Sequence, residues 1–85
     1  MIKYNITLSK KAQKNLDKLP DKIAVSILEE VLLLENNPRP FGYKKLKGRD
    51  AYRIRVGNYR IIYEIFDKEL VIDVINLGHR KDIYE

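Results

Sequence analysis

The chain has 85 residues, of which 45% are hydrophobic, and its 17 Lys and Arg against 12 Asp and Glu give a formal charge of +5. This length and composition predict one domain, residues 1–85, with a hydrophobic core of its own. The lack of cysteine and the single histidine argue against zinc fingers, iron–sulfur clusters and thiol nucleophiles, and no apolar run approaches the ~20 residues of a membrane span, so we expect a cytoplasmic protein without metal, cofactor or membrane contact.

The first half of the chain predicts one strand and two helices. Residues 2–8 alternate apolar and polar side chains, which is typical of a half-buried strand. Ser9 fits the N-cap of a helix that ends at Pro20, and a second helix follows in 21–34 with a wide apolar stripe. Pro38 stops this helix, and we expect both stripes to pack the helices together and onto a sheet.

The segment 39–50 carries prolines, glycines and lysines and predicts a mobile loop. Positive charge is concentrated in residues 39–60, which contain eight Lys or Arg and one Asp and so carry a net charge of +7. Such density is typical of a polyanion binder, although a solvated basic surface is about as common. The candidate substrate-binding side chains are Lys44, Lys45, Lys47 and Arg49.

Residues 51–65 predict a hairpin with a defined register. Two strands flank the dipeptide Gly57-Asn58, and a two-residue turn makes the numbers of each facing pair sum to 115. Alternation then puts the apolar side chains on one face, against the helices, and places Arg53, Arg55 and Arg60 on the other. Three neighbouring guanidinium groups repel one another, so this face predicts an anion ligand.

The last strand, 70–77, is apolar on both faces, as in the interior of a sheet, and it ends at Gly78. The polar tail 79–85 could fold back over the arginine face. The element order predicts an α+β fold: an N-terminal strand and a two-helix hairpin packed on a curved, mainly antiparallel four-stranded sheet.

This pattern resembles the RelE/ParE superfamily of type II toxins over nearly the whole chain. The matching segments are the strand with Tyr4, the helix with Ala12, Leu16 and Leu19, the stretch Lys45-Leu46-Lys47-Gly48, the hairpin from Tyr52 to Tyr63, and Gly78 through Tyr84. The resemblance implies a toxin held inactive by a cognate antitoxin. The RelE branch is a metal-independent endoribonuclease that cuts messenger RNA in the ribosomal A site, whereas the ParE branch inhibits DNA gyrase without cleaving RNA.

The RelE active site, carried over by position, falls on Arg53, Arg55, Arg60, Arg80 and Tyr84. Guanidinium groups suit a reaction in which the 2′-hydroxyl of RNA attacks the adjacent phosphorus, because they bind phosphate oxygens in pairs while charge develops. We assign Arg60 and Arg80 to the scissile phosphate, with Arg53 and Arg55 sharing substrate positioning and charge stabilisation.

The general base is open, because arginine does not release its proton in proteins. His79 and Tyr84 are the candidates, although a surface histidine and a frayed terminal tyrosine explain the same residues without catalysis. Two other functions also remain open: a gyrase-directed binding protein, and a plain RNA-binding domain. The expected partners are an antitoxin, which would cover the apolar helical face or the basic surface, and the ribosome with its messenger RNA.

Overall fold

The computed structural model describes residues 3–83. Its elements are β1 (Asn5–Leu8), α1 (Lys10–Asp17), α2 (Asp21–Leu33), β2 (Lys44–Lys45), β3 (Tyr52–Val56), β4 (Tyr59–Phe66) and β5 (Val71–His79). The strands form one sheet in the order β1-β5-β4-β3-β2, in which β1 runs parallel to β5 and the other pairs are antiparallel. The predicted α+β fold is confirmed, with β5 in the interior of the sheet.

The sheet has five strands, one more than predicted. The extra strand, β2, lies in the segment expected to be a loop and pairs with the start of β3. Its two residues are exposed lysines, so they carry no apolar alternation by which a strand could be recognised. Leu46 follows them and is buried, and its N–H donates to the carbonyl of Ala51 at 2.9 Å.

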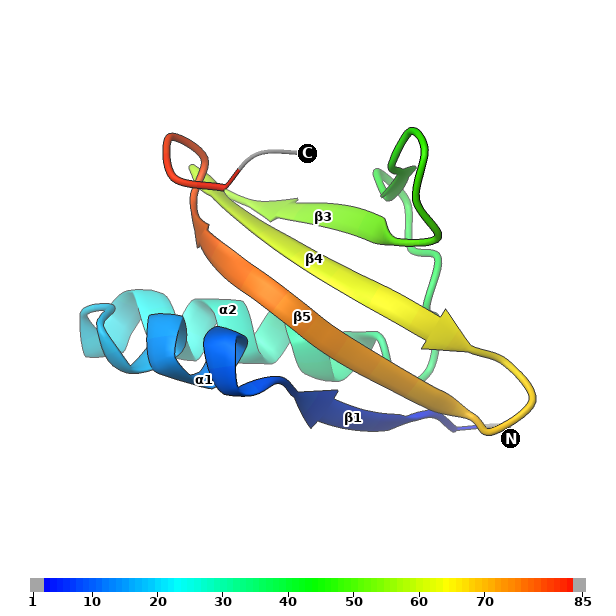
Figure 1. Cartoon of the computed structure of the whole chain (residues 1–85). Coiled ribbons are helices and arrows are strands. Elements are labelled where there is room, and N and C mark those ends of the chain that lie inside the picture. The colour runs from blue at the N-terminus through cyan, green and yellow to red at the C-terminus, as the bar shows by residue number, and fades with distance from the viewer. Residues whose placement is uncertain (1–2, 84–85) are drawn as a thin grey trace.

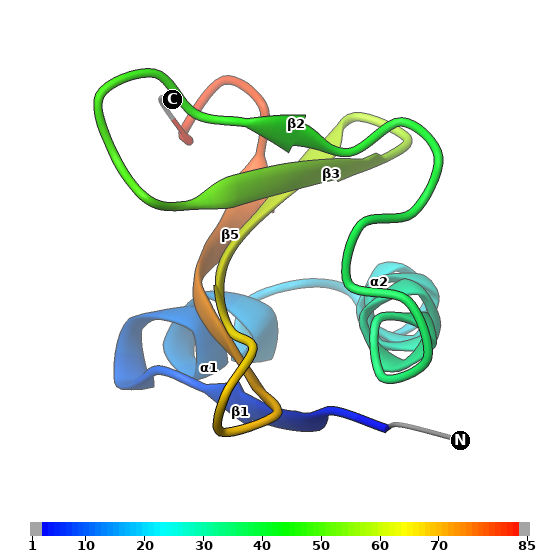
Figure 2. The ribbon, with the colours of Figure 1, turned by 90° about the vertical axis from the view of Figure 1, so that its right-hand side faces the viewer.

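The helices begin where the sequence predicts and cover one face of the sheet (Figures 1 and 2). The Ser9 hydroxyl accepts the N–H of Ala12 at 3.0 Å and so caps α1. The main core lies between helices and sheet and consists of Ala12, Leu16, Ile27, Val31, Leu34, Ile54, Ile61, Tyr63, Ile72, Val74 and Leu77. The apolar stripe of α2 is wider than the face that the helix buries, and its Leu28 and Leu32 remain exposed. No helix in residues 3–83 is long and apolar enough to cross a membrane.

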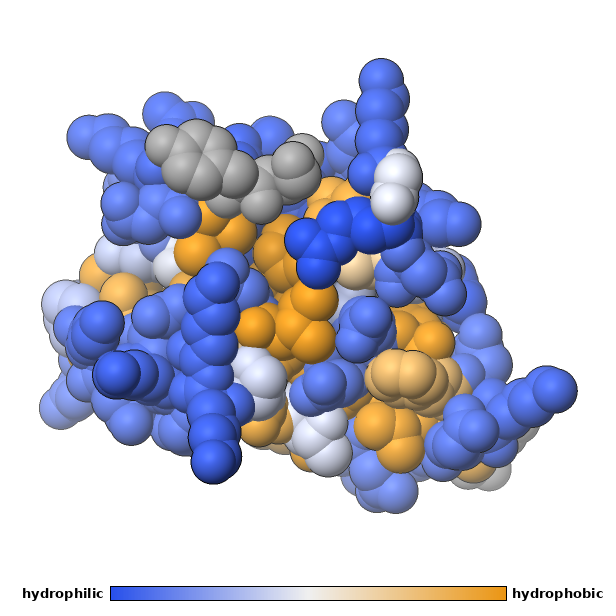
Figure 3. Space-filling view, viewed as in Figure 1, coloured by the Kyte–Doolittle hydropathy of each residue, from blue (hydrophilic) through white to orange (hydrophobic). Residues whose placement is uncertain are grey.

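A smaller apolar cluster covers the opposite face of the sheet. It joins Leu46 and Ala51 to Ile62 of β4 and to Ile83 of the C-terminal segment. Ile83 packs over Gly78 so closely that a Cβ at position 78 would lie 3.1 Å from its side chain. In Figure 3 apolar surface continues along β5 between charged side chains. The tail through residue 83 therefore does fold back over the sheet.

A polar cluster ties the segment after α2 to the β4–β5 turn. Asp67 accepts a hydrogen bond from the Tyr4 hydroxyl at 2.7 Å and pairs with the guanidinium of Arg39 at 3.0 Å. Arg39 also lies over the ring of Tyr52, 5.6 Å from its centroid. The hydrogen bonds from Arg39 and then Tyr4 hold the pKa of Asp67 below its usual value.

Replacing Asp67 by asparagine tests this cluster. A lowered folded-state pKa contributes stability above the unfolded-state pKa of about 4, and this contribution is lost as the pH falls through the folded value. We therefore expect Asp67→Asn to lower the urea midpoint at pH 7, and the two proteins to converge as the pH falls through the lowered folded-state pKa of Asp67. Urea denaturation across this range measures the effect, with Asp50→Asn as the control that removes an exposed charge. Parallel curves for Asp67→Asn and wild type would contradict the prediction.

Candidate nucleic-acid interface

The β3–β4 hairpin carries the arginines in the predicted register. Val56 faces Tyr59 across the turn, and Arg55 faces Arg60 directly. Gly57 has φ of 58°, a left-handed conformation that glycine adopts without strain and that a two-residue hairpin turn requires. Because the alternate residues of both strands pack into the main core, Arg55 and Arg60 emerge on the face opposite the helices.

The arginines are not equally accessible, which corrects the expectation of an open arginine face. Arg55 and Arg80 are exposed, Arg60 is half-buried, and Arg53 is only 6% exposed. Arg60 donates from Nη1 to the carbonyl oxygen of Ile83 at 2.9 Å. The returning tail and the small cluster therefore cover part of this face, and only Arg55 and Arg80 extend freely to solvent.

The residues after β5 reach the same end of the sheet as the hairpin turn. Gly78 pairs with Arg60 in the β4–β5 register, and the backbone N–H of Arg80 donates to the carbonyl of Asn58 at 2.8 Å. Arg80 is thus fixed by its backbone beside the turn that separates Arg55 from Arg60. The structure brings together three guanidinium-bearing residues from three strand ends, with Arg53 further along β3.

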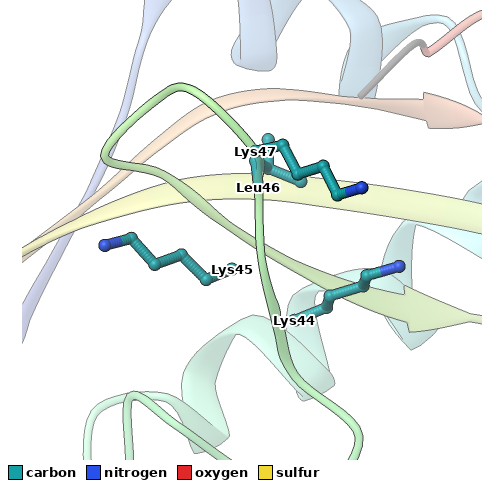
Figure 4. A pocket seen from close by; sticks show the side chains of 4 residues that line it. All are labelled: Lys44, Lys45, Leu46 and Lys47. Carbon is teal, nitrogen blue, oxygen red and sulfur yellow. The ribbon is translucent and has the colours of Figure 1, made fainter.

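A second basic surface lies at the edge strand β2 and the loop behind it. Lys44, Lys45, Lys47 and Arg49, the candidate substrate-binding residues, are all exposed. Three of them line a hollow of about 210 Å³ (Figure 4), where Lys44 and Lys45 extend in opposite directions from the strand. Separated ammonium groups of this kind match the spaced charges of a nucleic-acid backbone better than one compact anion.

The structure describes one of the two candidates for proton transfer, His79, and not the other. Tyr84 lies outside the described residues 3–83. His79 ends β5, where its ring meets that of Tyr59 edge-on at 5.4 Å and its Nδ1 accepts the N–H of Lys81 at 3.2 Å. Within residues 3–83, no three His, Asp or Glu side chains gather closely enough to hold a metal ion.

The sequence reading missed the residues that hold this surface in place. Ile83 anchors the tail in the small cluster and presents its carbonyl to Arg60, and Leu46 anchors the lysine loop in the same cluster. The one available signal was the isolation of each aliphatic residue within a charged stretch, which indicates a buried anchor.

Comparison with known proteins agrees with this geometry. The family described as "ParE toxin of type II toxin-antitoxin system, parDE" matches residues 6–84. The chain is 31% identical to the putative toxin RelE1 of Methanocaldococcus jannaschii, over 99% of this chain and 98% of that protein. It is 27% identical to the mRNA interferase toxin RelE of Escherichia coli K12, over 92% of this chain and 84% of that protein.

Among solved structures, the chain is similar to the RelE of the archaeal RelE–RelB complex from Pyrococcus horikoshii OT3. The TM-score is 0.82 at 35% identity, and the match covers 98% of this chain and all of that one. The likeness therefore extends to both the main core and the returning tail.

Proposed function

Since this chain belongs to the RelE/ParE superfamily of type II toxins, we propose that it cleaves messenger RNA in the ribosomal A site and that a cognate antitoxin holds it inactive. The observation that carries the proposal is the facing pair Arg55–Arg60 with Arg80 fixed at the same end of the sheet. Like charges directly opposite each other oppose folding, so an anion that binds between them would offset this repulsion.

The reaction that suits this surface needs no group beyond the RNA and the protein. The 2′-oxygen loses its proton and bonds to the adjacent phosphorus, the bond to the 5′-oxygen breaks, and that oxygen takes up a proton. The products are a 2′,3′-cyclic phosphate and a 5′-hydroxyl. Arg60 and Arg80 would donate hydrogen bonds to the phosphate oxygens, which gain negative charge in the transition state.

Arg55 and Arg53 would have different roles, because they differ in exposure. Arg55 is exposed and would bind the flanking substrate directly, whereas Arg53, at 6% exposure, would contribute its charge from within the sheet surface. A charge held at low dielectric acts more strongly on a neighbouring phosphate than the same charge in water. Of the two candidates for removing the proton of the 2′-hydroxyl, we propose Tyr84, because His79 shares the helix-side face of the sheet with Tyr59.

The lysine surface on β2 and its loop would bind RNA backbone next to the reacting phosphate. Each lysine that replaces a counterion on single-stranded RNA adds about 0.7 to the slope of affinity against salt on logarithmic scales. Lys44, Lys45 and Lys47 would thus supply affinity that weakens with salt and is independent of sequence.

An antitoxin has two surfaces to cover, and they differ in chemistry. The outer side of α2 exposes Val25, Leu28, Leu32 and Leu33, which an amphipathic helix could bury. The arginine face instead calls for acidic side chains. The RelE–RelB complex from Pyrococcus horikoshii supports the proposal that this chain also has a protein partner.

The activity itself is tested with purified protein and translating ribosomes. We expect messenger RNA to be cut at codons in the A site and the same RNA, free in solution, to stay largely intact, because positioning by the ribosome supplies most of the in-line geometry. Primer extension maps the cuts, and addition of a co-expressed antitoxin should suppress them. Intact messages on ribosomes would overturn the proposal.

A second function is favoured by one specific observation, because the matched family carries the ParE description. In that case the basic surface would bind gyrase or its DNA without cleaving RNA. Gyrase-linked DNA breaks, together with uncut messages in the ribosome assay, would establish this function in place of the first.

A further inference from the structure

His79 receives three successive backbone N–H groups of the tail. The N–H groups of Asp82 and Ile83 donate to its carbonyl oxygen at 2.8 and 3.2 Å, and that of Lys81 donates to its ring Nδ1 at 3.2 Å. A side chain that accepts the N–H two residues ahead, while its carbonyl accepts the next ones, has the geometry of an N-cap on a single helical turn. Histidine here does what serine or asparagine does at the start of a helix.

The imidazole lies on the wrong side of the sheet for proton transfer at the arginine face. His79 pairs directly with Tyr59, so the two side chains share a face, and Tyr59 packs against the main core on the helix side. Their rings meet edge-on at 5.4 Å beside a hollow that Asn15 of α1 and Lys18, the residue after α1, also line. Arg60 follows Tyr59 in the strand and therefore points to the opposite face.

The turn that His79 caps carries Arg80 and contacts Arg60 of β4, the two residues assigned to the scissile phosphate. Arg80 is its first residue, and the backbone N–H of Arg80 reaches Asn58 in the hairpin turn. Ile83 ends the turn, and its carbonyl accepts the hydrogen bond from Arg60 Nη1. A change in the turn would therefore displace Arg80 and alter the position of Arg60.

We infer that His79 is a positioning residue whose Nδ1 caps the 79–83 turn and so places Arg80 and Arg60, and that it is not the general base. The effect of His79 on cleavage rests on the proposed nuclease function, whereas the capping hydrogen bond is a property of the folded chain. In the neutral ring, an Nδ1 that accepts leaves the proton on Nε2.

Two substitutions separate the acceptor from the ring. His79→Asn keeps an acceptor at the capping position but cannot transfer protons, whereas His79→Phe keeps the ring against Tyr59 but has no acceptor. We expect single-turnover cleavage on ribosomes to stay within about threefold of wild type for His79→Asn, with an unchanged pH profile. We expect His79→Phe to lose roughly 10- to 100-fold, as small displacements of catalytic groups do.

The other outcomes overturn the inference. Equal large losses in both variants would make His79 the base, and an active His79→Phe with an impaired His79→Asn would reduce its role to ring packing. If wild type itself cleaves nothing, the nuclease proposal fails, and the cap is tested separately. Nitrogen NMR of the His79 imidazole then shows whether Nδ1 carries a proton. The cap is supported if Nδ1 is unprotonated and if amide exchange at residues 81–83 is slow in wild type and His79→Asn but fast in His79→Phe. A protonated Nδ1, or equally fast exchange in all three proteins, refutes the cap.

Discussion

Replacing Arg80 by alanine is expected to slow ribosome-dependent cleavage by roughly 10²- to 10³-fold, the usual loss when one donor to a developing oxyanion is removed. Stability should change by less than about 0.5 kcal/mol, because the side chain is exposed and alanine keeps the backbone N–H that donates to Asn58. Single-turnover cleavage and urea denaturation of the same preparation measure the two effects.

The neighbouring Lys81 supplies the matched control. Lys81→Ala removes one exposed positive charge one residue away, so it reports the loss of general attraction to RNA without the loss of a phosphate ligand. Arg60→Ala is a less clean test, because Arg60 is half-buried and also donates to Ile83. Cleavage by Arg80→Ala at the wild-type rate would remove Arg80 from the reaction.

The hairpin was predictable because its information is local. A two-residue turn fixes the register, the register fixes which residues face one another, and alternation fixes the two faces. Arg55 opposite Arg60 follows from Gly57-Asn58 alone, and the structure has this pair. Ser9 as the cap of α1 was predictable for the same reason, since its hydrogen bond spans three residues.

The covering of the arginine face was not predictable because it depends on contacts between distant segments. Arg53 faces Ile62 across the hairpin. Ile62 belongs to the small cluster, which Leu46 and Ile83 complete from segments 37 residues apart in the sequence. The capping role of His79 was hidden in a different way. In the sequence a histidine suggests proton transfer. Only the positions of the backbone amides that follow His79 show that its Nδ1 accepts a hydrogen bond.

Substitution of Tyr63 is expected to have the largest effect on stability. Tyr63 is fully buried beneath the sheet, and its hydroxyl donates to the carbonyl of Pro38 at 2.7 Å. Tyr63→Ala should cost about 3–5 kcal/mol through lost packing and a cavity, a large part of the 5–15 kcal/mol typical of a small domain. Tyr63→Phe keeps the ring but leaves the Pro38 carbonyl without this donor, so it should cost about 1–3 kcal/mol. Urea denaturation at pH 8 measures both.

The phenol also predicts a difference at alkaline pH. Burial raises the pKa of Tyr63, so the neutral form is favoured in the folded state, and the stability that this gives is present below the unfolded-state pKa near 10 and lost as the pH rises through the folded value. Wild type should therefore lose its advantage over Tyr63→Phe as the pH rises above about 10. Tyr43→Phe, at an exposed tyrosine, is the control and should change little. A Tyr63→Phe protein as stable as wild type at pH 8 would show that the hydrogen bond to Pro38 does not hold the segment before β2 against the sheet. Cleavage by this variant below its melting temperature should still proceed, because the backbone of Arg80 is fixed to Asn58 and not to Tyr63 itself.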